Sequence, residues 1–284
     1  SNLGGLSVDS SSGKSEGWLR SIINFYQDKK SNISTQQLRS QETYTGNCSV
    51  EGTYTVNIDQ NGNKTYTFNN CKNTCAQGKY AIMNGTIVFS EKDTDGNKIP
   101  NKLKTTIKAG FTYENQCDNE KVIAEKDFSE SIVGKWSNGD IWDKNYNWNA
   151  DLTVNGGPII LYEGTFYSKS SFNNLSYSYY EYDLPNSNGD YEYQWSAKGS
   201  YVYEDNRCVK TPITISLNTT NVFKGINDYC EYTGFLSINN NLITFEAYDP
   251  DNNPKTENNY KLTFNGKVIF NDVCTNLKPP ETCQ

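Results

Sequence analysis

The sequence predicts an all-β protein: an antiparallel meander of repeated long hairpins with one N-terminal helix. Three observations lead to this fold class. Several segments alternate apolar and polar residues, turn residues such as Asn-Gly and Asp-Gly separate them, and a phrase ending in cysteine recurs along the chain. The meander could form a curved sheet, a barrel or a sandwich.

The composition is that of a folded protein with little affinity for nucleic acid. The 284 residues carry a formal net charge of −7, and Leu, Ile, Val and Phe together number only 57. Twenty-one Tyr and five Trp supply the apolar area that the aliphatic residues lack, so we expect a packed core. The chain has no excess of basic residues that would bind the phosphates of a nucleic acid. No apolar run is long enough for a membrane-spanning helix. We therefore expect neither a nucleic-acid partner nor a transmembrane segment.

Catalytic chemistry is limited by the absence of histidine from the chain. Without histidine there is no Ser-His or Cys-His catalytic pair and no His-ligated metal site. The 33 Asp and Glu residues could supply a carboxylate pair for glycoside hydrolysis, but no spacing singles one out. We therefore expect that the protein is not an enzyme.

The first 39 residues differ from the strands that follow. Residues 1–14 are rich in Ser and Gly and are expected to form a flexible tether. In residues 15–39, Trp18, Ile22 and Phe25 fall on one stripe at helical spacing, which predicts a helix followed by a linker. This helix would pack on the sheet or close a barrel end, or it would dock on a membrane surface or a partner.

An internal repeat is marked by a phrase of aromatic or apolar residues, then Asn or Asp, then cysteine. The phrase stands at Tyr66–Cys71, Phe111–Cys117, Tyr201–Cys208 and Val268–Cys274. The cysteine spacing repeats as well, since separations of 23 and 42 residues in the first half return as 22 and 44 in the second. We therefore expect three β units. They are two disulfide-clasped hairpin repeats at 40–120 and 208–284, and a Trp- and Tyr-rich repeat at 121–207.

Eight cysteines and no histidine predict disulfides, and hence an oxidising compartment. Cys71 and Cys75 have a spacing that zinc sites permit, but no second close pair faces them. Because successive reversals of a meander lie at opposite ends, the cysteines would share one end of the sheet and the Asp/Asn/Gly turns the other. Hairpin geometry then predicts four bridges. They are Cys48–Cys71, Cys75–Cys117, Cys208–Cys230 and Cys274–Cys283.

Two turns carry alternating carboxylate and amide oxygens that could surround Ca²⁺. The candidate ligands are Asp93, Asp95 and Asn97 in the first turn and Asp249, Asp251 and Asn253 in the second, with Asn186–Asp190 as a third copy. The pattern departs from an EF-hand loop, since Gly96 stands at the fourth position and no Glu stands at the twelfth. The alternative is that these are ordinary tight turns, which favour the same residues. Calcium is the one cofactor that the sequence suggests.

Aromatic residues suggest two contact surfaces. Trp136, Trp142 and Trp148 lie among Asp and Asn and could stack on sugar rings, or they could fill the core of a chain short of Leu. The Tyr-rich hairpin between Tyr177 and Tyr203 places rings on both faces of the sheet. Those rings would serve an adhesive surface or would stabilise the sheet as cross-strand pairs.

Together these features predict a non-enzymatic, exported bacterial protein at the cell surface, outside the cell or in the periplasm, with a structural or adhesive role. Unpaired strand edges would let it self-assemble into filaments or oligomers. Its partner would be another copy of the chain, a surface or a glycan. Two alternatives stay open: a carrier that holds an apolar ligand in a curved sheet or barrel, and a glycan-binding module.

Overall fold

The computed structural model of the chain describes residues 2–3, 6–7, 43–94, 96, 101–134, 150–181, 185–227 and 229–277. Within the predicted tether, β1 (Asn2–Leu3) pairs with β2 (Leu6–Ser7) as a short hairpin. The rest of the tether and the whole predicted helix at 15–39 lie outside the described residues. In the part of the chain that the structure describes, no helix is long and apolar enough to cross a membrane.

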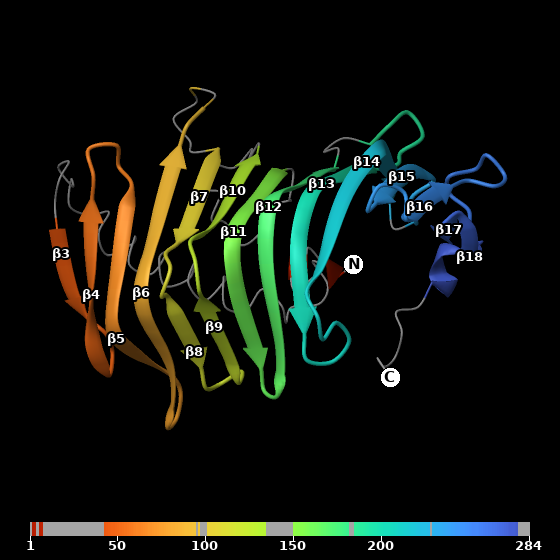
Figure 1. Cartoon of the computed structure of the whole chain (residues 1–284). Coiled ribbons are helices and arrows are strands. Elements are labelled where there is room, and N and C mark those ends of the chain that lie inside the picture. The colour runs from red at the N-terminus through yellow and green to blue at the C-terminus, as the bar shows by residue number, and fades with distance from the viewer. Residues whose placement is uncertain are drawn as a thin grey trace.

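Sixteen strands, β3 to β18, form one antiparallel sheet, which confirms the predicted all-β meander (Figure 1). The strands are β3 (Thr43–Asn47), β4 (Glu51–Ile58), β5 (Lys64–Ala76), β6 (Lys79–Lys92), β7 (Lys102–Ile107), β8 (Thr112–Asn115), β9 (Glu120–Ala124), β10 (Phe128–Gly134), β11 (Ala150–Glu163), β12 (Phe166–Glu181), β13 (Glu192–Asp205), β14 (Ile213–Ile226), β15 (Thr233–Ile238), β16 (Ile243–Tyr248), β17 (Asn259–Phe264) and β18 (Lys267–Val273). A 3-10 helix, η1 (Cys274–Asn276), follows the last strand.

The sixteen strands fill fourteen places in the sheet, because two places are each shared by two short strands. β6 pairs with β7 along one half of its length and with β8 along the other, and β11 pairs in the same way with β10 and β9. No pairing joins β3 to β18 among the described residues, so these strands are the two edges of an open sheet. Of the three predicted forms, the structure therefore has the curved sheet (Figure 1).

One face of the sheet carries the core. Tyr54, Tyr66 and Ile87 on β4, β5 and β6 are at most 4% exposed, and the residues beside them in each strand point to the opposite face. Phe111 and Phe223 continue this core along the sheet and are fully buried. We call this the inner face and the other the outer face. Tyr and Phe rings share this core with Val, Ile, Leu and Met side chains, so aromatic residues supply a large part of the buried apolar area, as the composition predicted.

A line of irregular positions crosses the sheet between β4 and β14. These positions are β-bulges, where the register of a strand pair shifts. Gly156 lies in the bulge between β11 and β12, and a Cβ atom there would stand 2.2 Å from the Asp127 carbonyl oxygen. Gly199 is the counterpart on β13, with a φ of +115° and a Cβ position 2.2 Å from the Asn174 carbonyl oxygen. Bulges bend strands and increase their twist, so we attribute the curvature of the sheet to this line. We call it the crease.

Asp127 forms hydrogen bonds across the crease, at the point where two neighbouring places of the sheet are each divided between two short strands. The break between β7 and β8 and the break between β9 and β10 lie side by side. The Lys108 Nζ donates to Asp127 Oδ2 at 2.7 Å, and the Ala109 N–H donates to Asp127 Oδ1 at 2.9 Å. These hydrogen bonds lower the pKa of Asp127. One carboxylate thus joins the two interrupted strands.

The three Asp-containing turns that the sequence analysis singled out share one end of the sheet, as predicted, whereas the Asn265-Gly266 turn between β17 and β18 lies at the other end. In an antiparallel row, every second connection lies at the same end. The connections β4–β5, β6–β7, β12–β13 and β16–β17 all leave even-numbered places in the row. Their turns therefore lie together along the upper rim in Figure 1. We call this rim the turn end.

Two of the predicted disulfides are confirmed. The Cα atoms of Cys48 and Cys71 are 5.4 Å apart, and those of Cys75 and Cys117 are 6.2 Å apart. Both bridges lie toward the end opposite the turn end, because Cys48 and Cys117 follow odd-numbered places and Cys71 and Cys75 lie in the second half of β5, another odd-numbered place. Since Cys71 and Cys75 are both disulfide-bonded, the zinc alternative for this pair is wrong.

The other two predicted bridges are wrong, because Cys230 bonds to Cys274. Cys208 is also in a disulfide, but not with Cys230. The 14 residues of β14 separate Cys208 from Cys230 and span about 45 Å. A disulfide needs Cα atoms within about 7 Å, so these two cysteines cannot meet. Cys230 and Cys274 both follow even-numbered places and therefore lie at the turn end, which the sequence analysis had reserved for the Asp turns.

Candidate functional site

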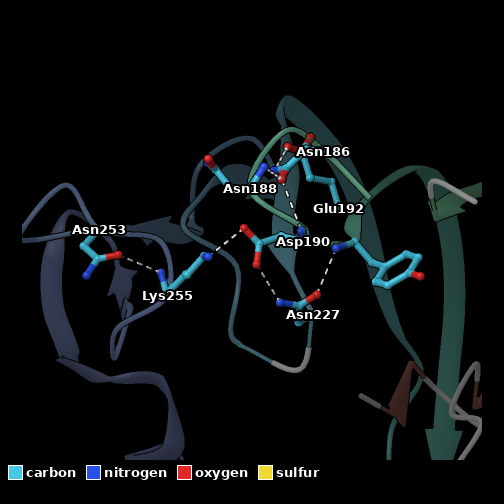
Figure 2. Close-up of polar contacts among 8 residues, drawn as sticks. Asn186, Asn188, Asp190, Glu192, Asn227, Asn253 and Lys255 are labelled. Atoms are coloured by element: carbon cyan, nitrogen blue, oxygen red, sulfur yellow. Dashed lines mark hydrogen bonds and ion pairs between the residues drawn. The ribbon is translucent and has the colours of Figure 1, made fainter. Parts of the chain in front are cut away.

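The turn end brings together two of the Asp/Asn turns (Figure 2). The Lys255 Nζ, from the β16–β17 turn, lies 2.8 Å from Asp190 Oδ2, from the β12–β13 turn. The Asp190 side chain is 8% exposed and the Lys255 side chain 43%. The hydrogen bond and charge of Lys255 lower the pKa of Asp190. An internal ammonium group thus neutralises the buried carboxylate at the meeting point of these turns.

Asparagine amides brace Asp190 from both sides. The Asn227 Nδ2 donates to Asp190 Oδ1 at 3.1 Å, and Asn227 Oδ1 accepts from the Tyr191 N–H at 2.9 Å. Asn186 Oδ1 accepts from the Asp190 N–H at 3.2 Å, and Asn186 Nδ2 donates to Glu192 Oε1 at 2.9 Å (Figure 2). The two amide oxygens thus accept hydrogen bonds from backbone N–H groups next to the start of β13. The contacts account for Asn in these turns without a ligand.

In the β16–β17 turn, the predicted calcium ligands bond to their own loop. Asp249 Oδ1 accepts from the Asp251 N–H at 3.1 Å, and Asp251 Oδ1 accepts from the Asn253 N–H at 3.0 Å. The Thr256 hydroxyl lies 2.9 Å and 3.1 Å from the two carboxylate oxygens of Asp251. The Thr256 and Asn253 hydrogen bonds lower the pKa of Asp251. A cation at this turn would have to replace these contacts.

The first predicted calcium turn is described only in part. Asp93 Oδ1 accepts from the Gly96 N–H at 2.7 Å, while Asp95 and Asn97 lie outside the described residues. No group of three or more Asp, Glu or Cys residues is placed to hold a metal ion within the ranges that the structure describes. Calcium binding by Asp93, Asp95, Asn97, Asp249, Asp251 and Asn253 stays a prediction.

The predicted glycan contacts Trp136, Trp142 and Trp148 also lie outside the described residues. Their role stays a prediction. The Tyr-rich hairpin is β12–β13, and its register places Tyr177, Tyr201 and other odd-numbered tyrosines on the inner face. Tyrosine therefore belongs largely to the core of this hairpin.

An aromatic row continues from this hairpin toward the C-terminal edge. The Trp195 and Phe223 rings stack at 4.0 Å with planes 3° apart, and Phe223 stacks on Phe245 at 5.3 Å. Tyr177 stacks on Trp195 at one end, and Phe245 meets Tyr260 edge to face at the other. The five rings come from five of the six strands between β12 and β17, and β15 contributes none. This fits the interpretation of the aromatic residues as cross-strand pairs that stabilise the sheet.

Glu231 joins two members of the aromatic row. Its Oε1 accepts from Trp195 Nε1 at 2.6 Å, and its Oε2 accepts from the Tyr260 hydroxyl. Burial raises the pKa of Tyr260, and the charge and hydrogen bond of Glu231 raise it further. One carboxylate therefore accepts hydrogen bonds from both Trp195 and Tyr260.

The outer face of β3 to β6 has a feature that sequence analysis missed. Thr45, Thr55, Thr67 and Thr86 are direct cross-strand neighbours in one row. The Oγ1 atoms of Thr45 and Thr55 are 3.4 Å apart, as are those of Thr67 and Thr86. Further rows lie on either side. We call the whole set the Thr/Asn face: Thr43, Thr45, Asn47, Thr53, Thr55, Asn57, Thr65, Thr67, Asn69, Thr86 and Val88.

The Thr/Asn face is uncharged and open to solvent. None of its eleven positions is buried and none carries a charge. With 21% of the chain charged, about two charged residues would be expected among eleven positions. The sequence held one signal for this face, because Thr-Tyr-Thr occurs at 43–45, 53–55 and 65–67. In a strand both Thr share one face and Tyr takes the other, but only the register shows that the three phrases lie on adjacent strands.

A cluster of acidic residues lies at the end of the sheet opposite the turn end, where β9 begins and β11 ends. Glu120 and Glu163 are directly opposite in the register, and Asp118 precedes β9. Glu120 Oε2 is buried without a hydrogen-bond partner among the described residues. Burial raises the pKa of Glu120 to about 7, with smaller effects from Asp118 and Glu163. The sequence analysis did not single out this buried carboxyl group.

Comparison with known proteins links the chain to a bacterial relative. The chain is 44% identical over 279 residues to a protein of Aquifex aeolicus (strain VF5) described as "Uncharacterized protein aq_aa17". The aligned region is 95% of this chain and 78% of the relative. No family model matches the chain, and no solved structure matches it.

Proposed function

The chain belongs to the same family as the Aquifex protein, and we propose that it is a non-enzymatic, exported protein with a structural or adhesive role at the cell surface. The observation that carries the proposal is the state of its cysteines. All seven that the structure describes are disulfide-bonded. Disulfides persist in oxidising compartments and are rare in the cytosol, which supports export. The bacterial relative supports a bacterial surface or periplasm.

The shape of the sheet supports the adhesive role. An open sheet of fourteen places offers a broad outer face, and the buried inner face beneath it holds that surface in one conformation. A preorganised surface loses little conformational freedom when it binds, so even a modest contact per strand adds up along the sheet.

Self-association through the sheet edges is a second part of the proposal. Because the row has an even number of places, β3 of a second copy would continue the antiparallel alternation beside β18. The β18 edge is partly guarded. Ile269 interrupts its register with β17, and the Asp272 carboxylate accepts the Val273 N–H at 2.8 Å. We therefore expect oligomers that form at high protein concentration.

Cell fractionation tests the exported location. An antibody against the chain would follow it through cytosolic, periplasmic and surface fractions, and a thiol-alkylating label added at lysis would report free cysteines. We expect a surface or periplasmic protein without labelled thiols. A cytosolic protein with alkylated cysteines would overturn the proposal.

Light scattering and electron microscopy, with and without a calcium chelator, test self-association. Oligomers that fall apart on chelation would place calcium at the Asp turns. A protein that stays monomeric at every concentration would contradict self-association and leave the adhesive role standing.

Mass spectrometry of the purified protein tests the carrier alternative. A retained apolar ligand in stoichiometric amount would favour that alternative.

A further inference from the structure

We propose that the Thr/Asn face is the docking surface for a neutral polysaccharide. This inference rests on the adhesive role proposed above and names the chemistry of the partner. It concerns β3 to β6 and does not involve Trp136, Trp142 or Trp148.

Hydrogen bonding on this face suits a polymer rich in hydroxyl groups. Each Thr hydroxyl can donate one hydrogen bond and accept two, and each Asn amide can both donate and accept. Neighbouring strands repeat about every 4.8 Å and alternate residues about every 6.8 Å, so these groups form a regular grid. Thr also offers a methyl group beside each hydroxyl. A pyranose ring has the matching combination, with hydroxyl groups at its edge and C–H groups on its faces.

The charge of the face decides among partner classes. An anionic polymer would be met by Lys or Arg, and a cationic one by Asp or Glu, because complementary charges steer association. The eleven positions hold neither. A protein interface would place aromatic residues or Arg at its centre, and the face has none. A neutral, hydroxylated polymer is the class that meets an uncharged grid of Thr and Asn.

The elements beneath the face hold it rigid. Tyr54, Val56, Tyr66 and Phe68 alternate with the Thr and Asn residues on β4 and β5 and are at most 4% exposed. The disulfide between Cys48 and Cys71 ties the β3–β4 connection to β5. The grid is therefore set before binding, so a partner would not have to order it.

The experiment is a depletion assay of the full chain with insoluble cellulose, chitin and starch granules. The test variant is Thr55→Glu with Thr67→Glu, two direct cross-strand neighbours at the centre of the face. The matched control is Thr153→Glu with Ser176→Glu, direct neighbours on the outer face of β11 and β12. Both doubles set two like charges opposite each other on solvent-facing strands. Because Ser176 also lies opposite Lys198, thermal unfolding of both doubles is measured before the binding assay.

We expect the wild type to bind at least one of the three polysaccharides and to keep that binding in 1 M NaCl, because no ion pair is involved. The Thr55 and Thr67 double should bind about tenfold more weakly, while the control double should bind as the wild type does. Thr55→Val with Thr67→Val removes the hydroxyls without adding charge and serves if the Glu double does not fold.

Three results would overturn the inference: no binding of the folded wild type to any of the three, equal loss in both doubles, or binding that salt abolishes. A surface-located protein that binds none of them would remove this inference and leave the proposed function standing. A cytosolic protein would remove the proposed function itself.

Discussion

Asp190 and Lys255 come from two turns that are 65 residues apart in the chain, and their charged groups lie 2.8 Å apart at the turn end. The pair links the β12–β13 turn to the β16–β17 turn (Figure 2), and so ties the middle of the sheet to its C-terminal strands (Figure 1). Because the Asp190 carboxylate is buried and Lys255 lowers its pKa, the ionised pair stabilises the fold.

Lys255→Met should lower the unfolding temperature at pH 7. A carboxyl group with a lowered pKa in the fold stabilises above its unfolded pKa, and this stabilisation disappears as the pH falls through the folded pKa. The difference between wild type and variant should therefore shrink as the pH is lowered from 7 toward 3. Thermal unfolding followed by circular dichroism measures it, with Lys267→Met on the exposed β18 edge as the control. A loss of equal size at both pH values would contradict the role of the ion pair.

Replacing both Cys230 and Cys274 by Ser should destabilise the C-terminal strands. The bridge spans 44 residues and encloses β15 to β18, so its loss should cost about 4 kcal/mol through the freedom gained by the unfolded chain. Urea unfolding of the double variant against the oxidised wild type measures the change. Peptide mapping of the wild type under non-reducing conditions provides an independent check, and recovery of a Cys208–Cys230 peptide would contradict the structure.

Glu120→Gln should stabilise the protein at pH 8 and have little effect at pH 4. The folded pKa of Glu120 is raised to about 7, mainly by burial. The wild type is therefore most stable with respect to this group below its unfolded pKa, and it loses that stability as the pH rises through 7. Unfolding temperatures at the two pH values test this, with the exposed Glu257→Gln as control. If the unfolding temperature of the Gln variant at pH 8 is no higher than that of the wild type, the pKa of Glu120 is not raised in the fold.

Gly199→Ala should be far more costly than Gly189→Ala. Both glycines have positive φ, but a Cβ at Gly199 would lie 2.2 Å from the Asn174 carbonyl, whereas nothing lies within 4 Å of one at Gly189. We expect a loss of about 3 kcal/mol or more for the first, from strain and overlap, and about 1 kcal/mol for the second. Urea unfolding of the two variants gives the comparison, and equal losses would show that the crease tolerates side chains.

Much of the architecture could be read from local patterns. Alternation predicted the strands, and the Asp-Gly and Asn-Gly turns predicted their reversals, because both depend on backbone geometry within a few residues. Cys48–Cys71 was predictable for the same reason: a single tight turn returns β5 to β4. Cys208–Cys230 looked equivalent by spacing, but the segment between them is one unbroken strand and not a hairpin.

The candidate site shows where local reading stops. The Asp and Asn turns were visible in the sequence, but the ion pair of Asp190 with Lys255 joins two turns through the stacking of hairpins in the sheet. Thr-Tyr-Thr was present three times, yet its value depends on cross-strand register. Glu120 has no sequence signature, since its pKa is set by burial and by Glu163 on a strand 43 residues later.

The sequence by itself determined that this chain is a β meander with disulfides, a core rich in aromatic rings and Asp-containing turns at one end, because these properties follow from side-chain alternation, turn geometry and composition. The tertiary structure alone decided that the sheet stays open, that Cys230 pairs with Cys274, and that threonines from four strands form one uncharged face. Those outcomes depend on strand lengths, bulges and register. These are settled by the packing of residues far apart in the chain, and neighbouring residues in the sequence do not specify them.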